Sequence, residues 1–226
     1  MTKAIITGDL IDSTRIEILQ RVYFIKQFEE ELNHLAKDFA MRSEIYRGDS
    51  FQSIIEEPIN ALKIALLQKT FIRSFNVFSG HKMNSSIPEK EIGLPISLFD
   101  VRIAIGIGEV EVLTDKLASS SGEAFHLSGQ LLDKMKNKKQ TIGIATGDKF
   151  NEELETEFIL LDTIISKTTA LQCVVIYYKL LDYTEHQIAK KLNIGQSAVN
   201  QRSISGNWNA IESMLKRFEK IYSNEK

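Results

Sequence analysis

Two aspartates, each at the end of an apolar run, are the side chains best suited to chemistry in this sequence. Asp9 follows Ala4–Gly8, an apolar run with the pattern of a buried strand. Asp49 follows Gly48 between two short strand-like runs, and this Gly-Asp pair favours a hairpin turn. If the strands lie side by side, the two carboxylates converge at one edge of a sheet. Such a pair can hold Mg²⁺ or Mn²⁺, hard ions that favour oxygen ligands.

A simpler interpretation of the same residues remains open. Asp9 and Asp49 can be ordinary turn residues, and Asp12 can cap the helical pattern that follows it. Ser13 and Thr14 are also suitable caps, because their hydroxyls accept from the unpaired amides of a first helical turn. Asp12 is therefore either a third carboxylate of the metal site or a helix cap.

Residues 1–165 alternate between apolar patterns of strand and helix type. This order predicts an α+β sandwich with a largely antiparallel sheet and helices over one or both faces. Gly106 and Gly108, near the end of a central strand, permit close backbone approach. A loop is expected over 78–97. The predicted elements are a strand ending at Asp9, one long or two short helices over 16–40, the hairpin at 48–49, a helix opened by Pro58, strands over 101–108, 141–145 and 158–165, a helix after Gly122, and a helix between the last two strands.

Residues 166–226 contain helical patterns alone and are expected to form a second domain. A capping box, Thr184 with Gln187, begins one of these helices. The next helix presents polar side chains that can read base edges in a DNA groove or clamp phosphates: Gln196, Ser197, Asn200, Gln201 and Arg202. This segment holds nine Lys/Arg against five Asp/Glu, which fits a polyanionic partner. The alternative is a helical hairpin used for dimerisation or domain packing.

The whole chain has the composition of an ordinary globular protein. Its 226 residues are 43% hydrophobic and 26% charged, with a net charge of −2. The lone Cys173 leaves no disulfide framework and no zinc cluster, and the four histidines lack metal-ligand spacing. No apolar run approaches the roughly 20 residues that span a bilayer. The expectation is a cytoplasmic protein without a membrane segment.

Three resemblances add to these patterns. The stretch Tyr183–Arg202 resembles the helix-turn-helix of region 4 in sigma factors. The body resembles the catalytic domain of class III nucleotide cyclases, a ferredoxin-like or palm fold, on the motifs 9–14, 46–51, 101–110 and 122–131. Within them, Asp12 and Ala104 stand where a Gly is usual. The order of the two parts resembles the SatD family, which implies a bacterial regulator with no known substrate.

The cyclase resemblance implies metal ligation by Asp9 and Asp49. It also implies nucleotide contacts by a wider set of residues: Leu10, Ser13, Thr14, Gly48, His126 and Gln130. The family places Asn where His126 stands and Arg where Gln130 stands. Because a neutral Gln cannot stabilise charge on a transferred phosphoryl group, the cyclase-like domain is expected to be degenerate. Arg47 and Arg102 are alternative cations.

The resulting hypothesis is a homodimeric DNA-binding transcription regulator with a nucleotide-binding, degenerate cyclase-like domain. The alternative is a metal-dependent nucleotidyl cyclase or related phosphoryl-transfer enzyme acting on a nucleoside triphosphate. A third possibility is a pseudoenzyme scaffold that binds neither metal nor DNA.

Overall fold

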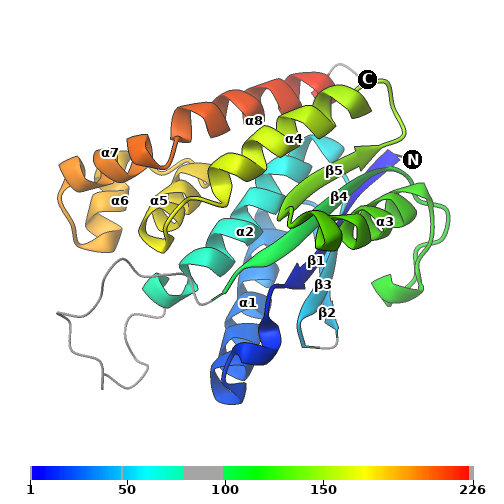
Figure 1. Ribbon diagram of the computed structural model, residues 1–226, viewed down its shortest axis with the longest axis horizontal. Coiled ribbons are helices and arrows are strands. Elements are labelled where there is room, and N and C mark those ends of the chain that lie inside the picture. Colours follow the sequence, from blue (N-terminus) through cyan, green and yellow to red (C-terminus); the bar gives the residue numbers. More distant parts are fainter. Residues whose placement is uncertain (1, 47, 79–98, 224–226) are drawn as a thin grey trace.

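A five-stranded mixed sheet forms the centre of the molecule (Figure 1). The computed structural model describes residues 2–46, 48–78 and 99–223, so the loop expected over 78–97 lies almost wholly outside them. The strands run in the order β2-β3-β1-β4-β5, and only β4 and β5 are parallel. The predicted α+β class and largely antiparallel sheet are therefore confirmed. The strands are β1 (Thr2–Leu10), β2 (Met41–Tyr46), β3 (Ser50–Ile55), β4 (Val101–Glu109) and β5 (Ile142–Thr146).

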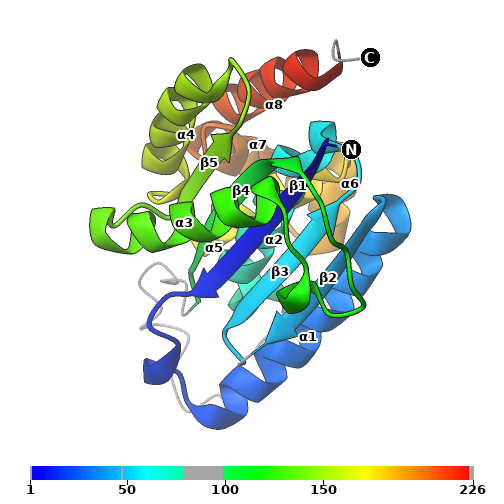
Figure 2. The ribbon, with the colours of Figure 1, turned by 90° about the vertical axis from the view of Figure 1, so that its right-hand side faces the viewer.

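Helices cover both faces of this sheet (Figure 2). Helices α1 (Ile18–Asp38) and α2 (Ala61–Phe78) lie on one face, and α3 (Glu123–Lys138) lies on the other. Between α1, α2 and the sheet, phenylalanine rings stack closely; the centroids of Phe24 and Phe99 are 4.4 Å apart. These apolar contacts form the main hydrophobic core.

Helix α3 approaches the sheet very closely at a glycine. A Cβ atom on Gly106 would lie 2.2 Å from the carbonyl oxygen of Ala124 and 2.6 Å from the backbone nitrogen of Ser128. Next to this contact, the hydroxyl of Thr7 donates to the Ser128 hydroxyl at 2.9 Å. The close approach expected at Gly106 is confirmed, and it fixes α3 above β1 and β4.

The strand predicted over 158–165 is wrong, because these residues belong to helix α4 (Asn151–Ile165). Leu154, Phe158, Leu161 and Ile165 are buried at helical spacing. The run Phe158–Leu161 suggested a strand because it is continuously apolar, yet Ile159 and Leu160 are 58% and 62% exposed. A short apolar run does not distinguish a strand from a helix.

The outer edge of β5 is covered by side chains that follow it in the sequence. The carboxylate of Asp162 accepts from the backbone N–H of Ile142 at 3.2 Å, and the Asn151 side chain accepts from that of Thr146 at 2.8 Å. These contacts also fix the position of α4 beside the sheet.

Four helices follow, α5 (Ala170–Leu180), α6 (Glu185–Leu192), α7 (Gln196–Ser205) and α8 (Trp208–Ser223). Helix α5 packs on α2, and the ring centroids of Tyr177 and Phe71 are 6.0 Å apart. Helix α8 returns to the body, where Leu215 and Phe218 join the main core. The two segments 1–165 and 166–226 thus share one core, and their division into domains stays a prediction.

None of the helices in the described residues has the length and apolar character that crossing a membrane requires.

Candidate functional site

Three neighbouring strands bring Asp9 and Asp49 together where the end of β1 meets the start of β3 and β4. We call this end of the sheet, with its two aspartates, the aspartate edge. Asp9, near the end of β1, lies opposite Ser50 on β3 and Arg102 on β4. The backbone N–H of Leu10 donates to the carbonyl oxygen of Asp49 at 2.8 Å. The expected hairpin places Asp49 directly before β3, with Gly48 in the left-handed region at φ 74°. The strand register therefore accounts for the convergence of the two aspartates.

Two basic side chains already contact Asp9. Nη1 of Arg102 lies 3.4 Å from Oδ2 of Asp9, and Nζ of Lys136 lies 3.9 Å from the same oxygen. Burial raises the pKa of the Asp9 carboxyl, and the negative charge of Asp49 adds to the rise, while Lys136 and Arg102 oppose it. The protein thus supplies positive charge at the carboxylate that a cation would bind. Arg47, the other cation considered from the sequence, lies outside the described residues.

Two hydroxyl groups donate hydrogen bonds to the Asp49 carboxylate. The hydroxyl of the buried Ser13 donates to one carboxylate oxygen at 3.1 Å, and that of Ser50 donates to the other at 3.4 Å. Leu10 is buried and contributes its backbone, whereas Thr14 is exposed. Ser13 therefore orients the Asp49 carboxylate.

Asp12 adds no third carboxylate to this pair. Its side chain is exposed, makes no capping hydrogen bond and pairs with Arg15 at 3.0 Å. In the described ranges, no three Asp, Glu, His or Cys side chains gather in a way that could hold a metal ion. The carboxylate ligands available to a cation at this edge are accordingly Asp9 and Asp49, with the remaining positions left to water or substrate oxygens.

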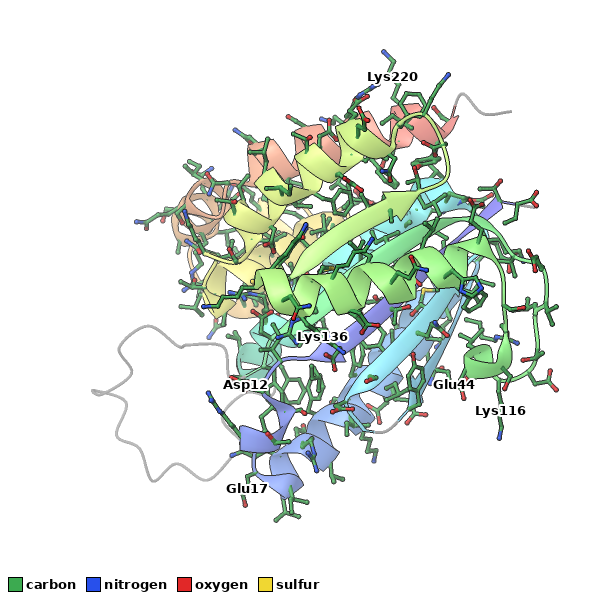
Figure 3. All side chains as sticks on the ribbon, turned by 45° about the vertical axis from the view of Figure 1, so that its right-hand side comes forward. Asp12, Glu17, Glu44, Lys116, Lys136 and Lys220 are labelled. Atoms are coloured by element: carbon green, nitrogen blue, oxygen red, sulfur yellow. The ribbon has the colours of Figure 1, made fainter. Side chains whose placement is uncertain are left out.

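His126 and Gln130 do not join this edge within one chain. Both are exposed on α3, whereas Lys136 marks the end of α3 that lies beside Asp12 (Figure 3). His126 is ten residues from Lys136, which corresponds to about 15 Å along the helix axis. Gln130 lines a cavity between α3 and α4. The six predicted nucleotide contacts are therefore divided, with Leu10, Ser13, Thr14 and Gly48 at the aspartate edge and the other two elsewhere.

Helices α6 and α7 form a compact pair joined by Asn193, Ile194 and Gly195. Asn193 ends α6 in the left-handed conformation, and the N–H of Ile194 donates to the Ala189 carbonyl at 3.1 Å. A small separate core of Ile188, Ala189 and Val199 packs on Val174 and Val175 of α5. The capping box of Thr184 and Gln187 is confirmed.

The outer surface of α7 carries the polar side chains singled out from the sequence. Gln196, Ser197, Asn200 and Gln201 are exposed, and Arg202 is half-buried. The Asn200 amide makes one long contact, 3.4 Å, to Glu185 on α6. The face is thus open and polar.

Sequence reasoning missed Lys136, Ser50 and the orienting role of Ser13. Lys136 lies 127 residues after Asp9 in the chain, and only the packing of α3 over β1 brings them together. Ser50 could have been found from the hairpin, because it directly follows Asp49 in the strand that pairs with β1.

No protein-family model matches the chain, and no curated protein matches it. Two solved structures of bacterial light-regulated adenylyl cyclases are similar, each at 11% identity, with TM-scores of 0.43 and 0.46. Each match covers 64% of this chain, and they cover 75% and 43% of those chains. A likeness this weak carries no argument about function, and the resemblances to the SatD family and to sigma region 4 remain proposals.

Proposed function

We propose that this chain is a DNA-binding transcription regulator whose α6–α7 pair reads DNA and whose sheet edge at Asp9 and Asp49 binds a nucleotide. The observation that carries the proposal is the outward polar face of α7, which a three-residue turn and a small dedicated core hold in place. A helix held in this way can enter a major groove with Gln196 and Asn200 toward base edges.

Two lysines on α6 support the proposal that α7 faces DNA. Lys190 and Lys191 lie in the last turn of α6, and the ammonium of Lys191 lies 5.1 Å from the ring centroid of Tyr183. Basic groups beside a recognition helix can contact phosphates and set its register on the duplex.

The aspartate edge is the proposed ligand site, and its built-in cations suit a phosphate-bearing ligand. Arg102 and Lys136 can each exchange their contact with Asp9 for one with a phosphate oxygen. We further propose that two copies act together, since DNA-binding helix pairs of this kind usually read two half-sites.

Fluorescence anisotropy with genomic fragments tests this function. We expect sequence-dependent binding, and Asn200→Ala should weaken it by about 1–3 kcal/mol, the discrimination of one base contact. The matched control is Asn209→Ala, an exposed asparagine on α8, which should leave affinity unchanged. Salt-sensitive binding that is indifferent to sequence would contradict a regulatory role.

A second candidate function rests on the convergence of Asp9 and Asp49. In this candidate the chain is a metal-dependent nucleotidyl cyclase or related phosphoryl-transfer enzyme, and the two carboxylates hold Mg²⁺ or Mn²⁺. A bound ion would supply charge neutralisation for a triphosphate and activation of a hydroxyl nucleophile. Two oxygen donors at one edge fit such an ion, although Arg102 and Lys136 compete with it for Asp9.

Incubation with each nucleoside triphosphate and Mn²⁺ separates the two candidates. Cyclic or oligomeric products that disappear in Asp49→Asn would establish the enzyme. Calorimetry on the wild-type protein should show nucleotide binding in either case, so binding without product from any of the four nucleotides would rule the enzyme out.

A further inference from the structure

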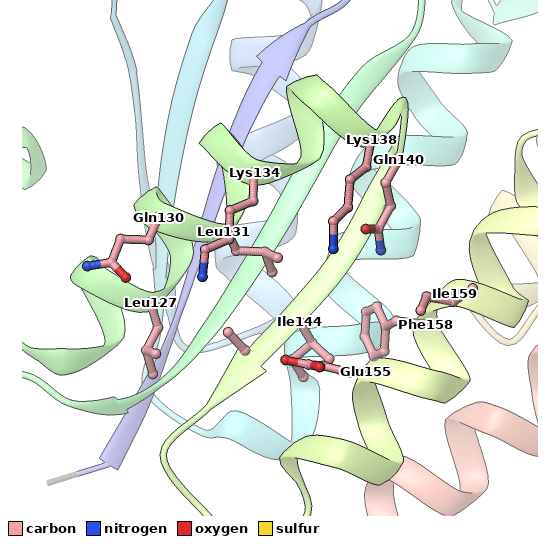
Figure 4. A pocket seen from close by; sticks show the side chains of 11 residues that line it. Leu127, Gln130, Leu131, Lys134, Lys138, Gln140, Ile144, Glu155, Phe158 and Ile159 are labelled. Carbon is pink, nitrogen blue, oxygen red and sulfur yellow. The ribbon is translucent and has the colours of Figure 1, made fainter.

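A cavity of about 290 Å³ lies between α3, β5 and α4, apart from the aspartate edge (Figure 4). Its floor is apolar and is formed by Leu131, Ile144 and Phe158. Ile159, which is 58% exposed, continues this apolar surface to the solvent. The volume is just below the roughly 300–1,000 Å³ typical of small-molecule sites, which suits a small ligand.

Two lysines from α3 reach over this floor. The side chains of Lys134 and Lys138 point from the helix toward the cavity (Figure 4). They are four residues apart, so they lie on the same side of α3, one turn from each other. Within the described residues, no ion pair joins either lysine to a carboxylate. Both ammonium groups are therefore available to a ligand.

The lysines at the end of α3 point to two different sites, the cavity and the aspartate edge. Lys136 lies two residues, or about 200° around the helix, from both Lys134 and Lys138. It reaches Asp9, whereas the other two face α4. The cavity and the aspartate edge thus lie on different sides of one helix, and a ligand in the cavity does not need Asp9 or Asp49.

Across the cavity, α4 contributes one polar group. Glu155 lines the cavity opposite the lysines and accepts a hydrogen bond from Asn151 at 3.0 Å. The positive side of the cavity is therefore the α3 side, and the Glu155 side disfavours an anion.

We propose that this cavity binds a small amphipathic anion, with a flat apolar body on the Leu131–Ile144–Phe158 floor and its anionic group at Lys134 and Lys138. The floor supplies the hydrophobic free energy, and the two ammonium groups supply charge-assisted hydrogen bonds. Glu155 fixes the orientation by keeping the anionic group on the α3 side. This site is independent of the proposed function.

The test uses a fluorescent probe of this chemistry, 8-anilinonaphthalene-1-sulfonate, with its uncharged counterpart N-phenyl-1-naphthylamine and the full chain at low salt. We expect saturable binding of the sulfonate at one site. The double variant Lys134→Gln/Lys138→Gln should weaken it about tenfold, the effect of losing charge-assisted contacts. The uncharged probe should bind both proteins equally.

Two further variants separate this site from general dye binding. Lys26→Gln/Lys37→Gln removes the same charge from exposed positions of α1 and should leave sulfonate affinity unchanged. Ile159→Glu adds a carboxylate at an exposed position of the cavity, so the fold is retained while sulfonate binding weakens. The proposal is overturned if both cavity variants bind the sulfonate within twofold of the wild type, or if the two probes bind equally well.

Discussion

The ammonium of Lys69 is fully buried and donates a hydrogen bond to the carboxylate of Asp100 at 3.1 Å. The same ammonium donates to the Val101 carbonyl at 2.8 Å. Arg73 pairs with the second oxygen of Asp100 and also donates to the Thr168 carbonyl at 2.7 Å. The Asp100 carboxylate therefore connects α2 to the start of β4, and Arg73 extends this connection to the segment that leads into α5.

Removing the charge of Asp100 should be strongly destabilising. Asp100→Asn leaves the Lys69 ammonium buried without its counter-charge, and a loss of about 3–5 kcal/mol in unfolding free energy is expected. Lys69→Met should cost less, because Asp100 keeps Arg73. Urea denaturation of both variants measures the difference, and an equal or larger loss for Lys69→Met would contradict this account.

The lowered pKa of Asp100 also makes the stability of the fold depend on pH. Burial alone would raise the pKa of Asp100, but the charges of Lys69 and Arg73 outweigh it and lower the pKa below its usual value. Asp100 thus stabilises the fold above its unfolded-state pKa of about 3.9, and this stabilisation is lost as the pH falls through the lower folded-state pKa. The stability gap between wild type and Asp100→Asn, measured by denaturation between pH 7 and pH 3, should therefore narrow at the acid end.

Gly106 in β4 and Gly129 in α3 should respond oppositely to a larger side chain, because only the Gly106 position lacks the space for one. Gly106→Val would force a Cβ against the α3 backbone, and a cost of about 1–3 kcal/mol or more is expected from overpacking. Gly129→Ala, inside α3 with open space around it, should stabilise by up to about 1 kcal/mol through helix propensity. Thermal unfolding of the two variants should shift in opposite directions.

The capping threonine of α6 offers a fourth measurement. Thr184→Ala removes the side-chain acceptor for the Gln187 N–H and should lower the unfolding free energy by about 1 kcal/mol. Thr156→Ala, at an exposed position of α4, should change it by less than about 0.5 kcal/mol. If both variants unfold alike, the cap contributes nothing to the stability of the chain.

The local sequence patterns were sufficient to predict most of the helices and strands and the two aspartates of the candidate site, but not the side chains that contact these aspartates. Asp9 and Asp49 could be placed together because a strand end and a hairpin turn are local features. The second half of α4 was assigned to a strand because its apolar run includes Ile159 and Leu160, which are exposed, against the pattern expected of a surface helix.

The partners of the aspartates required tertiary packing. Lys136 reaches Asp9 because α3 packs closely on β4, and this close packing requires the absence of a side chain at Gly106. Lys69 is hidden within an apolar helix, and its partner follows 31 residues later, so no local pattern could pair them. Long-range ion pairs of this kind depend on which helix covers which face of the sheet.

The α6–α7 pair is anchored at both of its ends. The chain enters it from α5 and leaves it through α8, and both of these helices are built into the main core. The pair is therefore held at both ends by packed helices and not by a flexible linker. In the proposed homodimer, the distance between the two pairs would be set by how the two copies pack against each other. Under the proposed function, selectivity for the distance between DNA half-sites would then be a property of residues 1–165, while α7 would determine which bases are read.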